Sequence, residues 1–457
     1  MPPPFLGTAV VGSGGLTAAI DAYGNVVELR APGPAGAALI DNPAERQTAG
    51  TVAPDTGIVP RVRVGGAWLP LWRADRVEQR YRPGTNVVVV EAALGATSVR
   101  IVYAAHHSLL ACLATVDGAT RGRAGVSLHS DEQAASRRLR CDDQQARRIV
   151  RNAARGDRRW LSRARPLGAD APAWASEMYG RSLLTLRALT DRRSGAVAAG
   201  ARDGWAYVWP RDAGTVALAF AAAGYEQEAR HVSRFLLGLD FKAAARFRGD
   251  GTPVPGRDAQ GDASGWVAVA ARAVDLPTPA RVLPWRDRAD YQERNPGDYL
   301  ANALASSLAD GPQSGRVGRF EARRPPVLMR DAGDPASGLD SAAAWAVRPF
   351  PQPRHFPAVR RTLLRLAAEQ TRFGIVPSQD WEEADPWSAP TAWSAWSLAA
   401  LGERRAALRL LTALRRSATP AGALPERVDA RTGVPRSTTP LAWSHAFAIL
   451  ALRELWP

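Results

Sequence analysis

The period of the apolar pattern changes once along the chain, and this change limits the folds that the chain can adopt. From Leu6 to about Val126, short runs alternate between apolar and polar residues and are broken by glycine, proline and aspartate. The clearest runs read NVVELRA, RVRVGGAW, NVVVVEAAL and SVRIVYAA. Alternation with frequent turns is typical of antiparallel strands in two packed sheets. We therefore expect a β-sandwich domain over residues 1–126.

From Pro172 onward the apolar residues recur with the helical period of 3.6. Roughly ten such segments follow, of about 9 to 17 residues each, and they are joined alternately by short turns and by longer loops rich in Pro, Gly and Asp. This pattern predicts a toroid of helical hairpins over residues 172–457. Residues 127–171 are polar, arginine-rich and then rich in proline, so they are expected to form a linker with one solvated helix at 146–165.

Composition narrows the class of protein further. The chain has 457 residues, 46% of them apolar, which is enough for two buried cores. The net charge of +15 would suit a nucleic-acid partner, but Lys242 is the only lysine and the arginines are spread over every segment. We therefore expect no nucleic-acid partner.

Compartment and cofactors are inferred from what the sequence lacks. It has no run of about 18 uncharged apolar residues, and the N-terminus has no basic stretch ahead of an apolar one, so no membrane partner is expected. The two cysteines suit a reducing compartment, and we expect a cytoplasmic protein. No metal-ligand or phosphate-loop spacing stands out, so no metal and no cofactor are predicted. The oligomeric state is not predictable from these features.

The segment YVWPRDAG at 207–214 carries the first chemical signal. It places aromatic rings, Arg211 and Asp212 on one short turn ahead of an apolar helix. Aromatic faces pack on the C–H side of a sugar ring, while a fixed Arg and Asp hydrogen-bond neighbouring hydroxyls. The alternative is a buried ion pair that only fastens the loop. The expected sugar contacts are Trp205, Tyr207, Trp209, Arg211 and Asp212.

A second signal lies at 424–450, in LPERVDARTGVPRSTTPLAWSHAFAIL. Glu426 stands in a loop punctuated by proline and glycine, ahead of a helix. Ser437 or Thr438 can hydrogen-bond its carboxylate and keep it ionised. The alternative is an exposed glutamate bonded to Arg427.

Together these two segments resemble the glucoamylase family, family fifteen of the glycoside hydrolases, which includes glucodextranases and bacterial trehalases. The resemblance extends to the N-terminal segment LGTAVVGSGGLTAAIDAYGNVVEL, to QGDASGW at 260–266 and to the stretch from Gly374 to Trp387. It implies an N-terminal antiparallel β-sandwich followed by an (α/α)6 barrel of twelve helices. The fifth and seventh helices would fall in 275–290 and 315–337, where helical pattern is faint, so the barrel is expected to be trimmed there.

The resemblance also implies roles for individual residues. Glu426 matches the general base, and aligning Asp290 with the family's aspartate places Glu293 on the general acid. Here Gln292 replaces the family's tryptophan and Arg294 its second glutamate. Both changes disfavour a protonated acid, so a surface pair between Glu293 and Arg294 stays open as the alternative.

The segment GIVPSQDWEEADPW resembles a later loop that forms a wall of the family's sugar site. We assign Asp380 and Trp387 to substrate contact there and keep Glu382 as second choice for the acid. In a hairpin toroid, loops after odd-numbered helices emerge at the same end. Asp212, Glu293, Asp380 and Glu426 would then share one mouth. Trp393, Trp396 and Trp443 fall within helices and are expected in the core, and Asp262 is expected to cap a helix.

The sequence therefore predicts an inverting exo-acting glycoside hydrolase that releases terminal non-reducing α-glucosyl units from short α-glucosides or trehalose. Its expected acid is Glu293, its base Glu426, and Ser437 supports the base. One alternative is a non-catalytic carbohydrate-binding or regulatory toroid. Another is a different reaction on the same barrel, by a lyase or a phosphorolytic enzyme.

Overall fold

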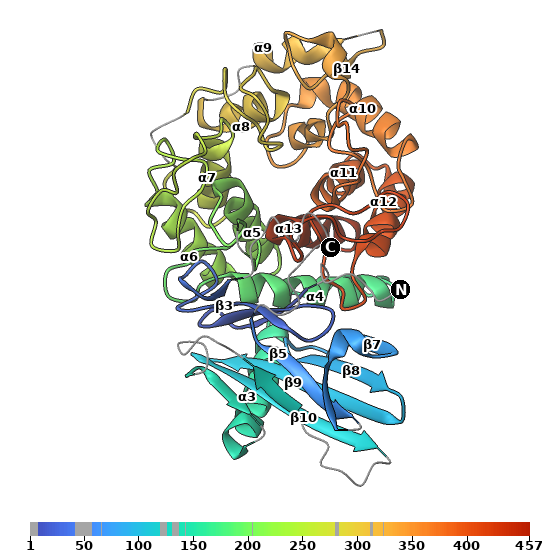
Figure 1. Cartoon of the computed structure of the whole chain (residues 1–457). Helices are drawn as coiled ribbons and strands as arrows, with labels where there is room; N and C mark the ends of the chain where they lie inside the picture. Colours follow the sequence, from blue (N-terminus) through green and yellow to red (C-terminus); the bar gives the residue numbers. More distant parts are fainter. Residues whose placement is uncertain are drawn as a thin grey trace.

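The computed structural model describes residues 8–41, 57–64, 66–118, 126–129, 137–141, 143–202, 204–278, 283–310, 314–322 and 324–457. The strands come first along the chain and the helices follow, forming a ring (Figure 1). Leu6 and Gly7, where the strand pattern was expected to begin, lie outside the described residues. The first described strand starts at Ala9.

The N-terminal strands form antiparallel sheets with a shared apolar core. A four-stranded sheet has the order β1 (Ala9–Gly12), β2 (Thr17–Ile20), β3 (Val26–Arg30) and β4 (Ala38–Asp41). A five-stranded sheet has the order β12 (Leu139–Cys141), β10 (Leu109–Gly118), β9 (Thr97–His106), β8 (Val88–Leu94) and β7 (Arg76–Tyr81). Among the described strands of this sheet, only β10 and β12 pair in parallel. A three-stranded sheet joins β11 (Val126–His129), β5 (Val59–Val64) and β6 (Ala67–Pro70).

Alternation along the strands determines which face packs where. Val11 and Ile20 of the first sheet share a core with Val90 and Ile101 of the five-stranded sheet. Their neighbours on the opposite face, among them Val10 and Ala19, belong to the core of the helical ring instead. The first sheet is thus buried on both faces, between the second sheet and the helices. The predicted β-sandwich is confirmed.

The linker helix is not solvated on all sides, contrary to our expectation. Helix α3 (Gln144–Leu161) begins at Asp143, whose carboxylate accepts a hydrogen bond from the backbone N–H of Ala146 at 2.6 Å. Ile149 and Val150 pack on the face of the five-stranded sheet that carries Val89 and Val102. The arginines lie on the other side of the helix, because only its apolar stripe can be removed from water at low cost.

The helices form a ring with two layers (Figure 1). The inner layer runs α5 (Pro210–Ala222), α7 (Ala263–Arg272), α8 (Leu300–Asp310), the 3-10 helix η4 (Ser341–Ala346), α11 (Ser388–Ala400) and α13 (Ala442–Leu455), and α13 closes on α5. The outer layer has α4 (Ala173–Leu189), α6 (Glu226–Leu237), α10 (Phe356–Ala368) and α12 (Arg404–Ser417). Inner helices are apolar all round, as α7 is, whereas α12 keeps its arginines on the outer side.

The ring is trimmed where the sequence predicted. Within 275–290, the described residues 275–278 and 283–290 contain no helix. The 315–337 region holds the end of a short helix α9 (Ser314–Val317), 3-10 turns η2 (Gly318–Phe320) and η3 (Pro335–Ser337), and a hairpin of β13 (Glu321–Ala322) and β14 (Val327–Leu328). Prolines such as Pro284 and Pro325 remove the N–H donors that a helix needs. Two 3-10 turns, η1 (Leu71–Arg73) and η5 (Pro353–His355), complete the described elements.

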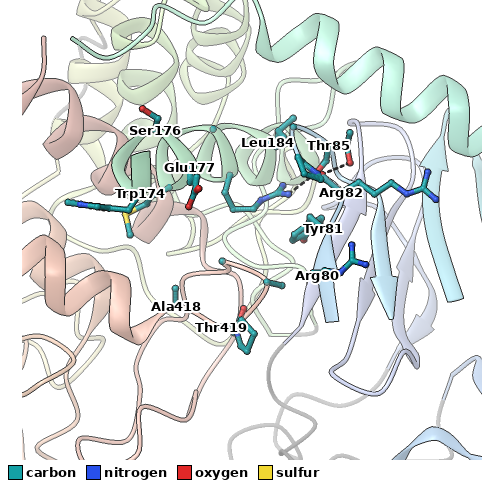
Figure 2. Close-up of a pocket in the computed structure, with 18 of the residues that line it drawn as sticks. Arg80, Tyr81, Arg82, Thr85, Trp174, Ser176, Glu177, Leu184, Ala418 and Thr419 are labelled. Carbon is teal, nitrogen blue, oxygen red and sulfur yellow. Dashed lines mark hydrogen bonds between the residues drawn. The ribbon is translucent and has the colours of Figure 1, made fainter. Parts of the chain in front are cut away.

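A polar contact joins the strands to the ring. The buried Asn86 donates from its side-chain amide to the carbonyls of Gly12 at 3.1 Å and Leu184 at 2.8 Å. Arg181 of α4 donates to the carbonyl of Thr85 at 2.9 Å and lies over the ring of Tyr81. Figure 2 shows the cavity of about 540 Å³ at this junction, between the end of β7, helix α4 and the loop after α12.

Candidate active site

The turn at the start of α5 holds Arg211 and Asp212 in a buried network. Pro210 occupies the first turn of the helix, where a missing N–H costs nothing. The Arg211 guanidinium donates to Gln260 at 2.8 Å and to Asp262 at 3.1 Å, and lies 3.6 Å from the Asp212 carboxylate. Burial raises the pKa of Asp212 to about 7, although Arg211 opposes the shift. This carboxyl is therefore poised to change charge near neutral pH.

Asp262 does not use its side chain as expected. It stands at the N-cap position of α7, but its carboxylate makes no capping hydrogen bond and instead accepts one from Arg211. A buried guanidinium has a stronger demand for an acceptor than a helix N-terminus has. Asp262 therefore orients Arg211.

Glu293 lies on a tight turn with an unusual backbone. Its φ of 56° is in the left-handed region, which a residue other than glycine adopts at a cost and which is enriched at functional sites. The turn is closed by the Glu293 N–H, which donates to the Asp290 carbonyl at 3.0 Å. Asp290 is fully buried and is held by Arg330, whose guanidinium donates to both carboxylate oxygens at 3.1 and 3.0 Å.

Three donors surround the Glu293 carboxylate. Oε1 accepts hydrogen bonds from the indole N–H of Trp209 at 2.7 Å and from the amide of Gln260 at 3.1 Å. Oε2 forms an ion pair with Arg257. The sequence pointed to Arg294 as the cation beside Glu293, but Arg294 pairs with Asp380 at 3.0 Å instead. Arg257 stands in an irregular loop, and no motif identifies it.

Glu426 is fastened by its backbone and by one side chain. Its N–H donates to the carbonyl of Thr438 at 3.0 Å, and its own carbonyl accepts from Ser388 at 2.9 Å. The Ser437 hydroxyl donates to Oε2 of the carboxylate. Burial raises the pKa of Glu426, and the hydrogen bonds from Ser437 and Trp205 partly oppose that shift. The alternative of an exposed pair with Arg427 does not fit, because the guanidinium of Arg427 binds the carboxylates of Glu383 and Asp385.

One cavity of about 100 Å³ brings most of the predicted residues together. Those that line it are Trp205, Trp209, Arg211, Asp212, Glu293, Trp387 and Glu426. The sequence did not predict the other residues of its wall, which are Ala199, Gly204, Arg257, Tyr291, Gln292, Leu441 and Trp443. The two glutamates expected to act together therefore face a common space.

Three predicted residues stand behind or beside this wall. Ser437 touches the site through Glu426. Tyr207 lies with its ring 4.8 Å from the Arg246 guanidinium. Asp380 is held by Arg294, by Arg330 at 3.1 Å and by the hydroxyl of Ser378. Their assignment to substrate contact stays a prediction. Glu382, the second choice for the acid, is exposed.

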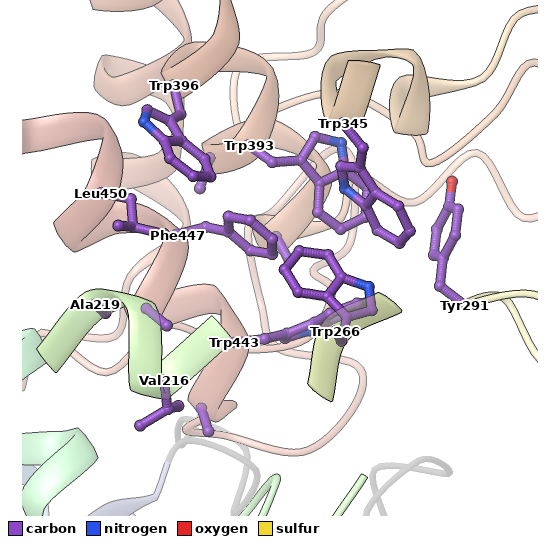
Figure 3. Close-up of a cluster of buried hydrophobic side chains, with 14 of the residues drawn as sticks. Val216, Ala219, Trp266, Tyr291, Trp345, Trp393, Trp396, Trp443, Phe447 and Leu450 are labelled. Atoms are coloured by element: carbon purple, nitrogen blue, oxygen red, sulfur yellow. The ribbon is translucent and has the colours of Figure 1, made fainter. Parts of the chain in front are cut away.

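Aromatic rings form the interior of the toroid beneath the cavity (Figure 3). Four of these rings pack edge to face: Trp266, Trp345, Trp393 and Phe447. The ring centroid of Trp266 lies 5.1 Å from that of Trp345 and 5.9 Å from that of Phe447. Trp443 joins this cluster at 5.4 Å from Trp393, and its ring also lies 4.7 Å from the Arg211 guanidinium. Trp443 is thus both core, as expected, and part of the cavity wall.

A second, larger cavity of about 810 Å³ adjoins the first. Arg257 and Glu293 line both, so they stand at the boundary between the two. Over the described ranges, no group of three or more His, Cys, Asp or Glu side chains is arranged to hold a metal ion. None of the helices in the described part of the chain is long and apolar enough to cross a membrane.

The ring of paired helices thus presents buried carboxyl groups and indole rings to one cavity. The family model described as glycosyl hydrolases family 15 matches residues 173–239, which include α4, the Arg211 turn, α5 and α6. Residues 173–239 of the chain are therefore similar to this family of glycoside hydrolases.

One solved structure shows a similar fold over nearly the whole chain, and another over about two thirds of it. A bacterial glucoamylase complexed with acarbose is 12% identical, with a TM-score of 0.71 over 99% of this chain and 95% of that one. A wild-type glycosidase is 19% identical, with a TM-score of 0.50 over 65% of this chain and 98% of that one. No curated protein matches the sequence significantly. The predicted combination of sandwich and trimmed toroid is confirmed by the first of these structures.

Proposed function

We propose that this protein is an inverting, exo-acting glycoside hydrolase that removes a terminal α-glucosyl unit, with Glu293 as general acid and Glu426 as general base. One observation carries the proposal: both glutamates line the cavity that Arg211 and Asp212 also line. Hydrolysis with inversion requires two carboxyl groups in different surroundings, with room for a water molecule between them.

The terminal sugar is assigned to the smaller cavity. Its volume of about 100 Å³ is much smaller than the 810 Å³ of the adjoining cavity, so we assign it one sugar ring and not a chain of sugars. Indole rings of Trp205, Trp387 and Trp443 offer faces for the C–H side of a pyranose. The rest of the substrate is assigned to the larger cavity, so Glu293 stands beside the bond that breaks.

The proton inventory follows from this arrangement. Protonated Glu293 gives its proton to the leaving oxygen as the bond from that oxygen to the anomeric carbon breaks. A water attacks the opposite face and loses a proton to Glu426, whose ionised form is stabilised by the hydrogen bond from the Ser437 hydroxyl. Oε1 of Glu293 already accepts two N–H groups, so Oε2 is the oxygen that carries the proton, once the Arg257 guanidinium has moved away from it.

Short α-glucosides and trehalose are the proposed substrates, in keeping with the cytoplasmic location that the sequence favours. Proton NMR of the protein with maltose, isomaltose, panose and trehalose tests this directly. With maltose, isomaltose and panose, early release of the terminal glucose as the β-anomer supports inversion, whereas its release as the α-anomer refutes it. With trehalose, inversion releases α- and β-glucose in equal amounts, whereas retention releases α-glucose alone. Acarbose, which the similar bacterial glucoamylase was solved with, serves as a binding probe.

Substitutions separate the two glutamates. Glu426→Gln is expected to abolish turnover while acarbose still binds. Glu293→Gln is expected to do the same, and Glu382→Gln serves as the exposed control with activity close to that of the unaltered protein. An active Glu293→Gln variant together with an inactive Glu382→Gln variant would transfer the acid role to Glu382. Binding of all four sugars by the unaltered protein without any turnover would favour the non-catalytic alternative.

A further inference from the structure

The larger cavity has an excess of positive charge. Its charged lining consists of the cations Lys242, Arg257, Arg286, Arg288 and Arg294 and the anions Asp258, Asp287 and Glu293. A neutral sugar needs hydrogen-bonding groups of either kind and gains little from so many cations. The smaller cavity shares only Arg257 and Glu293 with the larger one. The excess of positive charge therefore belongs to the larger cavity and not to the one that Arg211 lines.

Several of these cations have weak or exposed partners. Arg286 lies 3.7 Å from Asp298, and its side chain is half exposed. Lys242 is exposed and has no ion-pair partner among the residues that the structure describes. Arg294, by contrast, is fixed by Asp380. Lys242 and Arg286 therefore have donors available for a ligand, whereas Arg294 mainly shapes the wall.

Arg257 has the most informative position. It pairs with Oε2 of Glu293, the oxygen assigned to carry the catalytic proton, its side chain is 44% exposed, and it lines the larger cavity as well as the smaller one. The pKa of Arg257 is lowered by burial and by the neighbouring Arg246. A second anion beside this guanidinium would therefore stabilise its charged form. An anion in the larger cavity would compete with Glu293 for it.

We propose that the larger cavity receives a leaving group with an anionic substituent, a phosphate or a carboxylate, and that this anion draws Arg257 away from Glu293. The proposal rests on the function proposed above, because it places the leaving group on that side of Glu293. Arg257 is then a positioning residue: it selects for charge on the leaving group and releases Oε2 when that charge is present.

Binding alone tests the anion site. Calorimetry at low salt compares glucose, glucose 6-phosphate and glucuronate as ligands of the unaltered protein. We expect one charged sugar to bind at least about 10-fold more tightly than glucose, as one charge-assisted hydrogen bond supplies. The preferred sugar distinguishes phosphate from carboxylate. Lys242→Gln and Arg286→Gln should each reduce this preference, whereas Arg409→Gln, which removes an exposed charge from the outer helix α12, should not.

Turnover tests the role of Arg257. The test compares kcat/KM for a disaccharide phosphorylated at O6 of its leaving sugar with kcat/KM for the same disaccharide without phosphate. This ratio should exceed 1 in the unaltered protein and fall in Arg257→Gln. The ratio should fall for two reasons: kcat for the neutral parent rises because Oε2 of Glu293 is no longer held, and KM for the charged substrate rises because its anion loses a partner. A purely structural role would alter both substrates equally.

The outcomes separate the two proposals. Hydrolysis of neutral disaccharides, with charged sugars binding no more tightly than glucose, would overturn the anion site and leave the proposed function intact. Tight binding of a charged sugar without hydrolysis of any substrate would support the anion site and remove the proposed function. If the preference for the charged sugar over glucose is the same in Lys242→Gln as in Arg409→Gln, the anion site is also overturned, because the effect of charge on binding is then nonspecific.

Discussion

Replacement of Arg330 by methionine should be among the most damaging single changes in the ring. Arg330 is 3% exposed and binds both oxygens of Asp290, which is fully buried. Methionine keeps much of the volume but leaves the carboxylate without its cation. Removing one partner of a buried pair costs about 3–5 kcal/mol of unfolding free energy, because the other charge stays out of water. The turn that carries Glu293 begins at Asp290, so activity should fall as well.

The pH dependence of this loss is a sharper test. Burial raises the pKa of Asp290, and Arg330 opposes that shift. Without Arg330 the pKa of Asp290 rises further, so the folded variant holds a proton that the unfolded chain has already released. Stability then falls as pH rises from the pKa of the unfolded chain towards that of the folded variant. The difference from the unaltered protein should therefore be larger at pH 8 than at pH 5.

Denaturant unfolding at both pH values measures these differences, with activity recorded on the same samples. Arg294→Met is the matched control, since Arg294 binds Asp380 at 3.0 Å but its side chain is 29% exposed. It should cost only about 0.2–1 kcal/mol. The double variant Arg330→Met with Asp290→Asn should recover part of the loss. A cost for Arg330→Met below about 1 kcal/mol, or one independent of pH, would refute the reasoning.

Three further predictions concern single contacts. Ser437→Ala should raise the pKa of Glu426, since the Ser437 hydrogen bond lowers it, and should shift the acid limb of the kcat/KM profile to higher pH. Ser444→Ala is the control and should leave that limb in place, because the Ser444 hydroxyl binds the Pro425 carbonyl at 3.2 Å. Equal pH profiles for the two variants would contradict the role of Ser437. Gly265→Ala should lower the unfolding free energy by about 1–3 kcal/mol, because its Cβ would lie 2.1 Å from the Ala305 carbonyl oxygen. Gly156→Ala, in open space on α3, should instead raise it by about 0.5–1 kcal/mol, and a tolerated Gly265→Ala would disprove the close approach of α7 and α8. Asn86→Ala should lower the unfolding free energy by about 1–3 kcal/mol, because the buried carbonyls of Gly12 and Leu184 lose their donor. Asn152→Ala on α3 is the control and should be nearly neutral. Equal losses in the two variants would exclude a special role for the contact between the strands and the ring.

Local sequence predicted those parts of the fold that depend on local pattern. The change of period separated strands from helices, because side-chain alternation and helical spacing are properties of neighbouring residues. Arg211, Asp212 and Glu426 were also identified in this way, since each lies in a short segment whose order resembles that of a known family. Within the region where helical hairpins were expected, Ser341–Ala346 form the 3-10 helix η4, and the carboxylate of Asp340 caps it at the N–H of Ala342.

The residues that were missed lie in loops and meet the site only through closure of the ring. Arg257 and Gln260 precede α7, yet they contact Glu293, more than thirty residues later in the chain. No periodic pattern governs such loops, so their side-chain directions depend on distant packing. The alternative that paired Arg294 with Glu293 fails for the same reason. Arg294 is adjacent in sequence, but the left-handed backbone at Glu293 directs the chain so that Arg294 reaches Asp380.

The trimmed side of the ring gives the molecule an uneven distribution of local stability. Where outer helices would stand, described residues such as Trp285 and Phe320 cover α8 from irregular segments, with their rings 6.2 Å apart. Irregular backbone has fewer cooperative hydrogen bonds than a helix, so amides of this sector should exchange with solvent deuterium sooner than those of α11 and α13. The same sector contributes Pro284 to Pro296 to the wall of the larger cavity. Faster exchange there would make one wall of the larger cavity a less stable part of the ring than α11 and α13.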